Sequence, residues 1–189
     1  MFMGDMTGAL EAVLFASGDP VSGQQLMEIF SIDAESLNEM IDELARSLDE
    51  RKSGLMVQQV AGGWQLVTRQ ELFSYVEKLT QTKDKKISAA AMETLSIIAF
   101  KQPITKQEIE HIRGVHIEKV LSKLIELELV RELGRKDVLG RPILYGTTDN
   151  FLKCFGLNEL TDLPDLPDIE MASDEIEQLV LIDENTPSI

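Results

Sequence analysis

The sequence repeats itself at a spacing of 83 residues, and this repeat most constrains the fold. Phe15-Ala16 matches Ile98-Ala99, and Pro20-Val21-Ser22 matches Pro103-Ile104-Thr105. Further on, Leu26 and Ile29 match Ile109 and Ile112. The shared pattern is a helix, a proline followed by an aliphatic residue, and a Ser or Thr that can cap the next helix. Such self-similarity predicts two copies of one domain rather than one larger fold.

The first copy has the pattern of three helices followed by a β-hairpin. Gly18-Asp19-Pro20 ends an opening helix, and Ser22 with Gln25 matches a capping box at the start of the second. Asp33 can cap the third helix, in which apolar residues recur at helical spacing up to an expected end at Gly54. A hairpin is then predicted from Leu55–Val60 and 64–68, with a short helix over 71–79 after it.

The second copy follows the same plan. Ser88 can cap a helix through Phe100, Thr105 with Glu108 can cap the next, and Gly114 can make the turn before a third helix that runs to about Leu127. Strands are predicted over 129–133 and 143–147, on either side of a basic loop. Three helices and a two-stranded wing are the order of a winged helix. The prediction is therefore a mainly α protein with small β wings (α+β), made of two tandem winged-helix domains.

The distribution of charge predicts where these domains end. The chain has a net charge of −15; residues 1–82 carry −8, residues 83–155 carry +3, and residues 156–189 carry −10 with no basic residue. We expect domains at 1–79 and 88–157, and a polar linker over 80–87. An acidic tail is expected over 158–189. Its composition favours disorder, although part of it, over about 168–181, could form an amphipathic helix.

The sequence contains no catalytic, cofactor-binding or metal-binding motif. His111 and His116 match no metal-ligand spacing, and turn or surface positions are the simpler interpretation. Cys154 is expected to be a buried, unreactive thiol. The N-terminus lacks the features of a signal peptide, and no apolar run approaches the roughly 20 residues that cross a bilayer, so we expect a cytoplasmic protein without a membrane partner.

The winged-helix prediction raises the question of DNA binding. The third helix of the first copy is acidic and would be repelled by phosphates. In the second copy, Arg135, Lys136 and Arg141 of the wing are candidate phosphate contacts. No side chain of its third helix is placed to read base edges. We therefore expect weak, non-specific DNA binding at most, and keep a winged-helix transcription regulator as the alternative function.

Several ordered blocks of the second copy resemble segregation and condensation protein B. They are residues 92–105, 112–115, 134–137, 140–148 and 151–157, followed by Leu163-Pro164. The resemblance spans about residues 8–167. It departs from the family at Glu128, where the family usually has glycine after the third helix.

The resemblance implies a non-enzymatic accessory subunit that supports chromosome condensation and segregation. Such proteins form homodimers of two winged-helix domains and bind the kleisin subunit ScpA, which bridges an SMC ATPase. The implied localisation is cytoplasmic, with nucleoid association through this complex, and no cofactor is implied.

Two groups of residues are candidates for these contacts. Arg141, Tyr145, Phe151 and Phe155 have the chemistry of kleisin-binding anchors and lie within or just after the second wing. The competing interpretation is that Tyr145 and Phe155 are core residues and Arg141 only shapes the wing. In the first copy, Leu10, Leu14 and Phe15 are candidate homodimer contacts, with core packing as the competing interpretation.

Overall fold

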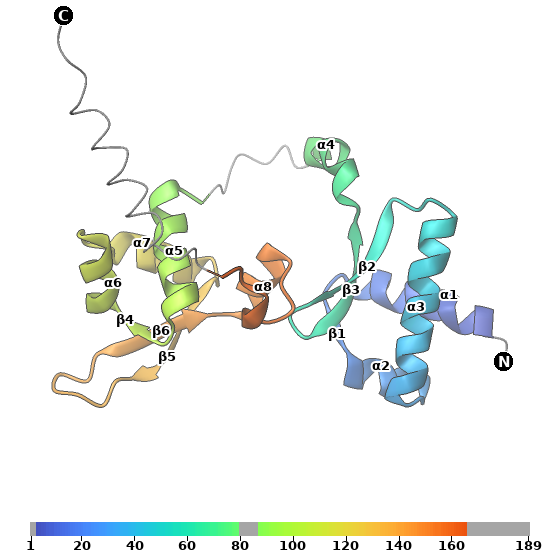
Figure 1. Ribbon diagram of the computed structural model, residues 1–189, viewed down its shortest axis with the longest axis horizontal. Coiled ribbons are helices and arrows are strands. Elements are labelled where there is room, and N and C mark those ends of the chain that lie inside the picture. The colour runs from blue at the N-terminus through green and yellow to red at the C-terminus, as the bar shows by residue number, and fades with distance from the viewer. Residues whose placement is uncertain (1–2, 80–86, 166–189) are drawn as a thin grey trace, which may run out of the picture.

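The computed structural model describes residues 3–79 and 87–165, which fold as two similar α+β units (Figure 1). The first unit consists of α1 (Met3–Ser17), β1 (Val21–Ser22), α2 (Gly23–Phe30), α3 (Ala34–Glu50), β2 (Leu55–Val60) and β3 (Gly63–Thr68). After it come η1 (Gln70–Leu72), α4 (Phe73–Val76) and η2 (Glu77–Leu79). The continuous helix predicted over 71–79 is therefore three short pieces.

The second unit has the same order of elements. It consists of α5 (Ala89–Lys101), β4 (Ile104–Thr105), α6 (Lys106–Arg113), α7 (Glu118–Glu126), β5 (Val130–Arg135) and β6 (Ile143–Thr147). It is followed by α8 (Asp149–Phe155) and η3 (Leu160–Asp162), neither of which was predicted. The predicted class, mainly α with small β wings, is confirmed.

Each unit has a third strand that the sequence did not reveal. The sheets have the orders β1-β3-β2 and β4-β6-β5, all antiparallel. Val21 of β1 is paired with Trp64, and Ile104 of β4 with Tyr145. A strand of two residues is too short to show the alternation that marks strands in a sequence. These strands connect the first and second helices of each unit to its hairpin.

The predicted helix caps are present. Ser22 with Gln25, and Thr105 with Glu108, form reciprocal capping boxes. Asp33 and Ser88 accept hydrogen bonds from the backbone at the starts of α3 and α5. Short-range hydrogen bonds of this kind depend on residues three positions apart, which explains why the sequence was sufficient to place them.

Three of the turns that contain residues with positive φ are the turn after α3, the first hairpin turn and the turn after α7. Gly54 does not end α3; the helix ends at Glu50, and Lys52 takes the left-handed conformation with φ of 52°. The first hairpin turns over two residues with positive φ, Ala61 and Gly62, as the right-handed twist of the paired strands favours. Glu128 has φ of 56°, which accounts for the glycine expected there, because glycine adopts this conformation without strain.

The repeat does not hold in the first helix of each unit. Ile98 is fully buried, whereas its predicted match Phe15 is 74% exposed, and Leu14 is buried instead. The reason is the length of the connection: α1 ends three residues before Pro20, and α5 ends two residues before Pro103. One residue of difference rotates a helix by about 100°.

Each unit encloses its own hydrophobic core. The first core contains Leu10, Leu14, Val21, Leu26, Leu37, Met40, Ile41, Leu44 and Leu48. The second contains Ala91, Leu95, Ile98, Ala99, Ile104, Ile109, Ile117, Leu121, Leu124, Leu129, Val130, Tyr145 and Phe151. Leu157 and Leu163 pack against the second core, so the chain remains attached to this unit well into the region predicted as tail. Residues 166–189 lie outside the described residues.

The segment after α8 contacts the hairpin turn of the first unit, and we call this contact the joint. The Ala61 N–H donates to the Leu157 carbonyl (2.9 Å), and the Gly62 N–H donates to Asn158 Oδ1 (3.0 Å). Lys153 Nζ lies 2.9 Å from Asp19 Oδ1. In Figure 1, α8 accordingly lies beside the β2–β3 hairpin.

Candidate partner-binding surfaces

The loop of the second wing is held in shape by its own backbone. The Lys136 N–H donates to the Pro142 carbonyl (2.8 Å), and the Arg141 N–H donates to the Val138 carbonyl (2.9 Å). Arg135 Nη1 donates to the Arg141 carbonyl (3.0 Å). The loop therefore presents its basic side chains from an ordered hairpin that extends away from the helices (Figure 1).

A hollow of about 300 Å³ lies between this wing and the start of α6. It is lined by Lys106, Gln107, Arg135, Pro142, Ile143 and Tyr145. The basic groups of Lys106 and Arg135 thus come from two different elements and flank a largely apolar floor. Tyr145 is only 8% exposed, and burial raises the pKa of its phenol, which stays neutral at physiological pH. Such a hollow suits a partner segment that combines an apolar side chain with negative charge.

Lys136 differs from its basic neighbours because it is already paired. Its Nζ lies 2.6 Å from Glu108 Oε1, and the same carboxylate accepts hydrogen bonds from the Thr105 backbone N–H and hydroxyl. The hydrogen bond from Lys136 and those from Thr105 lower the pKa of Glu108 to about 2. Of the three predicted phosphate contacts, Arg135 and Arg141 are therefore better placed than Lys136 to meet an external anion.

Removing the Lys136 amine is expected to raise the pKa of Glu108. In the native chain, the carboxylate contributes stability above its usual pKa of 4.5, and this is lost as the pH falls towards about 2. In Lys136→Met this contribution should be smaller, and its loss should be complete at a higher pH than in the native chain, because the largest cause of the lowered pKa is gone. Carboxyl NMR titration of Glu108 measures the change directly. Lys123→Met, which removes an exposed pair with Glu126, is the control, and an equal shift in both variants would contradict the assignment.

The four predicted kleisin anchors fall into two groups. Tyr145 and Phe151 are 8% and 3% exposed and belong to the second core, whereas Phe155 is 42% exposed. The rings of Phe151 and Phe155 pack with centroids 4.7 Å apart. Arg141 lies in the exposed wing loop. The structure does not bring Arg141 and Phe155 together, because the wing loop and α8 adjoin opposite ends of β6.

The three predicted dimer contacts also separate by burial. Leu10 and Leu14 are 0% and 1% exposed and are used by the first core, which leaves Phe15 as the side chain available to a partner. Phe15 borders a hollow of about 240 Å³, lined also by Gly8, Glu11, Ala12, Leu55 and Leu66. Small residues on this face of α1 would allow a second helix to approach closely.

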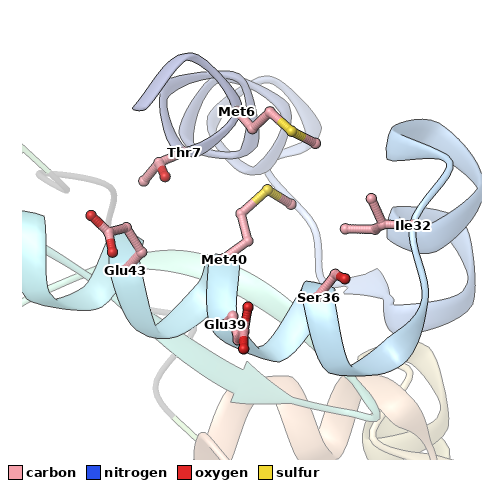
Figure 2. A pocket seen from close by; sticks show the side chains of 7 residues that line it. All are labelled: Met6, Thr7, Ile32, Ser36, Glu39, Met40 and Glu43. Atoms are coloured by element: carbon pink, nitrogen blue, oxygen red, sulfur yellow. The ribbon is translucent and has the colours of Figure 1, made fainter. Parts of the chain in front are cut away.

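A second groove of about 190 Å³ runs between α1 and α3, and Figure 2 shows the side chains that line it. Met6 of α1 extends towards Met40 of α3, and Ile32 closes one end. Thr7, Ser36, Glu39 and Glu43 complete the lining. The contribution of Ile32 depends on how the chain turns after α2 and could not be predicted from the spacing of residues.

The remaining candidate residues are the two histidines and the cysteine. The part of the chain that the structure describes has no group of three or more His, Cys, Asp or Glu that could hold a metal ion. His116 lies on the surface with Nδ1 3.3 Å from Glu110 Oε1. Cys154 is exposed, so the prediction of a buried thiol is wrong: α8 turns Phe151 inwards, and Cys154 lies on the outer side. Within residues 3–79 and 87–165, no helix is long and apolar enough to span a membrane.

Comparison with known proteins identifies relatives over nearly the whole chain. The family described as "Segregation and condensation complex subunit ScpB" matches residues 8–166. Segregation and condensation protein B of Moorella thermoacetica is 45% identical over 168 residues, which cover 89% of this chain and 86% of the relative. That of Desulforamulus reducens is 41% identical over 177 residues, covering 94% and 98%.

Two solved structures with matching sequences carry the name ScpB. ScpB from Mycobacterium tuberculosis is 29% identical, covers 83% of this chain and 98% of its own, and superposes with a TM-score of 0.40. A dimer of an ScpB N-terminal domain complexed with an ScpA peptide is 26% identical, covers 41% and 96%, and gives a TM-score of 0.39. On the family match and the sequence identity of these relatives, this chain belongs to the segregation and condensation protein B family.

Proposed function

We propose that this chain is a non-enzymatic accessory subunit of a bacterial SMC–kleisin complex. In this role it binds the kleisin ScpA, reaches the SMC ATPase through that kleisin, and supports chromosome condensation and segregation. The observation that carries the proposal is the family match over residues 8–166, which includes both units and the segment that packs on the second core. The proposed place of action is the cytoplasm, at the nucleoid.

We place the kleisin contact on the second unit, in the hollow beside the wing. Arg135 supplies the positive charge beside this hollow, since Lys106 is paired with Glu118, and Arg141 follows in the loop that forms its edge. A kleisin segment with an apolar side chain and flanking acidic residues would complement the hollow in shape and charge. Phe155 offers a separate contact beyond the far end of β6.

We place the homodimer contact on α1 of the first unit, around Phe15. Phe15→Ser in the full chain is expected to shift the protein from dimer towards monomer, because a two-fold interface loses the same apolar side chain twice. Light scattering and sedimentation over a dilution series measure the shift. Phe73→Ser is the matched control, since Phe73 is a 62% exposed phenylalanine on a different helix, α4. A Phe15→Ser chain as dimeric as the native one would place the interface elsewhere.

The alternative function, a DNA-binding transcription regulator, requires free positive charge. The exposed side of α3 carries Glu35, Glu39, Asp42 and Glu43. In the second unit, ion pairs join Lys106 to Glu118 (3.3 Å) and Lys123 to Glu126 (2.9 Å). These pairs reduce the positive charge that phosphates would meet. At most weak DNA binding is expected, and it should fall steeply with added salt.

Co-purification from native cells tests the proposal against this alternative. A kleisin and an SMC ATPase should be recovered with the chain and should stay bound after nuclease treatment. Recovery of a specific promoter fragment at physiological salt, without these two proteins, would instead support the transcription regulator.

A further inference from the structure

The second unit has an apolar groove that the proposed kleisin and dimer contacts do not use. It has a volume of about 170 Å³ and lies between α5 and α6, lined by Ser96, Ile97, Phe100, Lys101 and Ile112. Ile112 is 52% exposed, although Ile97 and Phe100 line the same groove. An open groove of this kind, with its apolar side chains close together, is suited to hold a few apolar side chains of another segment.

The walls of this groove are held in place by Arg113. Its Nη1 donates to the Ala90 carbonyl (2.7 Å) and to the Thr94 hydroxyl, and its Nη2 lies 3.2 Å from Glu93 Oε2. These bonds join the end of α6 to the first half of α5. The groove is therefore preformed, so a segment that enters it does not have to separate the two helices.

The last described residues of the chain lead directly to this groove. A hollow of about 420 Å³ is lined by Ala99, Phe100, Leu160, Thr161, Leu163, Pro164 and Asp165. Phe100 therefore borders both the hollow and the groove. The approach is fixed by Asp162, whose Oδ2 accepts hydrogen bonds from the N–H groups of Asn158 (2.8 Å) and Glu159 (3.0 Å). The chain thus leaves the described part at Asp165, in a hollow that shares Phe100 with the groove.

The sequence that follows has the composition to fill this groove. Leu166, Ile169 and Met171 come within six residues of Asp165, and residues 166–189 contain seven acidic residues and no basic one. Neighbouring packed helices lie about 8–10 Å apart, and an extended chain covers about 3.3 Å per residue. Three or four residues are therefore enough to reach from α5 to α6.

We propose that residues 166–171 fold back over α5 and occupy this groove, with Ile169 or Met171 against Phe100 and Ile112. Lys101 at the rim has no ion-pair partner among the described residues and would meet Asp168 or Glu170. Because the segment is tethered beside its site, its effective concentration is high, and a modest intrinsic affinity is sufficient. A partner that uses the groove must first displace the chain's own tail. This inference does not depend on the proposed function.

Methyl NMR of the full chain, compared with a chain that ends at Asp165, tests the proposal. The methyl signals of Ile97 and Ile112 should shift on truncation, and addition of a peptide of residues 166–189 should restore them. Ile29 is the matched control, because it occupies the position of Ile112 in the first unit and is 56% exposed. Its signal should not move.

Substitutions in the tail and in the groove distinguish the chain's own tail from two other possible occupants of the groove, a second copy of the chain and a kleisin peptide. The full chain with Ile169→Asp and Met171→Asp should reproduce the spectrum of the truncated one. Ile112→Asp should weaken peptide binding by about tenfold or more, whereas Ile29→Asp should leave it unchanged. Signals of Ile97 and Ile112 that are the same with and without the tail would overturn the proposal. So would shifts that depend on protein concentration, which indicate a second copy, or that arise only when a kleisin peptide is added.

Discussion

Replacing Phe151 with alanine is expected to lower the free energy of unfolding of the second unit by about 3–5 kcal/mol. The side chain is 3% exposed, belongs to the second core and packs against Phe155. Its removal leaves a cavity that the surrounding core cannot fill completely, so the cost exceeds that of transferring the ring to water. Denaturant unfolding, followed by a probe in the second unit, measures the loss.

Phe155→Ala is the matched control for this substitution. Phe155 is 42% exposed and lies one helical turn further along α8, so its loss should cost only about 1–2 kcal/mol. The pair separates two roles, a core residue and a binding anchor. If Phe151→Ala leaves the fold as stable as the native chain and weakens only kleisin binding, the assignment of Phe151 to the core is wrong.

The second large effect is expected at the wing, where Arg141→Glu should weaken the binding of an ScpA segment by about 1–4 kcal/mol. Arg141 is exposed and its backbone φ of 41° is held by the loop, so the substitution reverses the charge without disturbing a core. A binding titration beside a thermal melt distinguishes loss of affinity from loss of fold. The effect should shrink as salt is added, because it is electrostatic.

Arg131→Glu supplies the control for charge itself. Arg131 is also exposed, and it lies in β5 rather than in the wing loop. If both variants weaken binding equally, the partner responds to the net charge of the unit and not to the wing. If folded Arg141→Glu and Phe155→Ala chains both bind ScpA as the native chain does, the kleisin site lies elsewhere.

The elements that the sequence predicted well are those fixed by local interactions. The capping boxes at Ser22 and Thr105 each depend on a partner three residues away, and the apolar spacing of α3 follows from its helical period. The two-residue strands β1 and β4 were missed because their existence depends on pairing with β3 and β6, which lie far along the chain, as in the pairs Val21 with Trp64 and Ile104 with Tyr145. The repeat also concealed that α1 is rotated relative to α5. The residue types still match at a spacing of 83, although α1 ends one residue further from Pro20 than α5 does from Pro103.

The candidate surfaces were less predictable, because exposure depends on how elements pack. Phe151 and Phe155 have the same side chain on one short helix, yet only the first enters the core. Spacing could not decide this without knowing which side of α8 meets the sheet. Likewise, Leu14 and Phe15 are adjacent in sequence, but Leu14 is buried in the first core and Phe15 is exposed. The groove beside Phe100 requires α5 and α6 to be placed together.

The joint between the units has a consequence for how the whole chain unfolds. Two of its hydrogen bonds are made by the backbone of the first hairpin turn, and its ion pair, Lys153 with Asp19, is exposed to solvent. Contacts of this kind contribute little compared with two separate hydrophobic cores. The units should therefore lose their structure in separate cooperative transitions, and one melting temperature would not describe the chain. Damage to one unit would therefore leave the other folded.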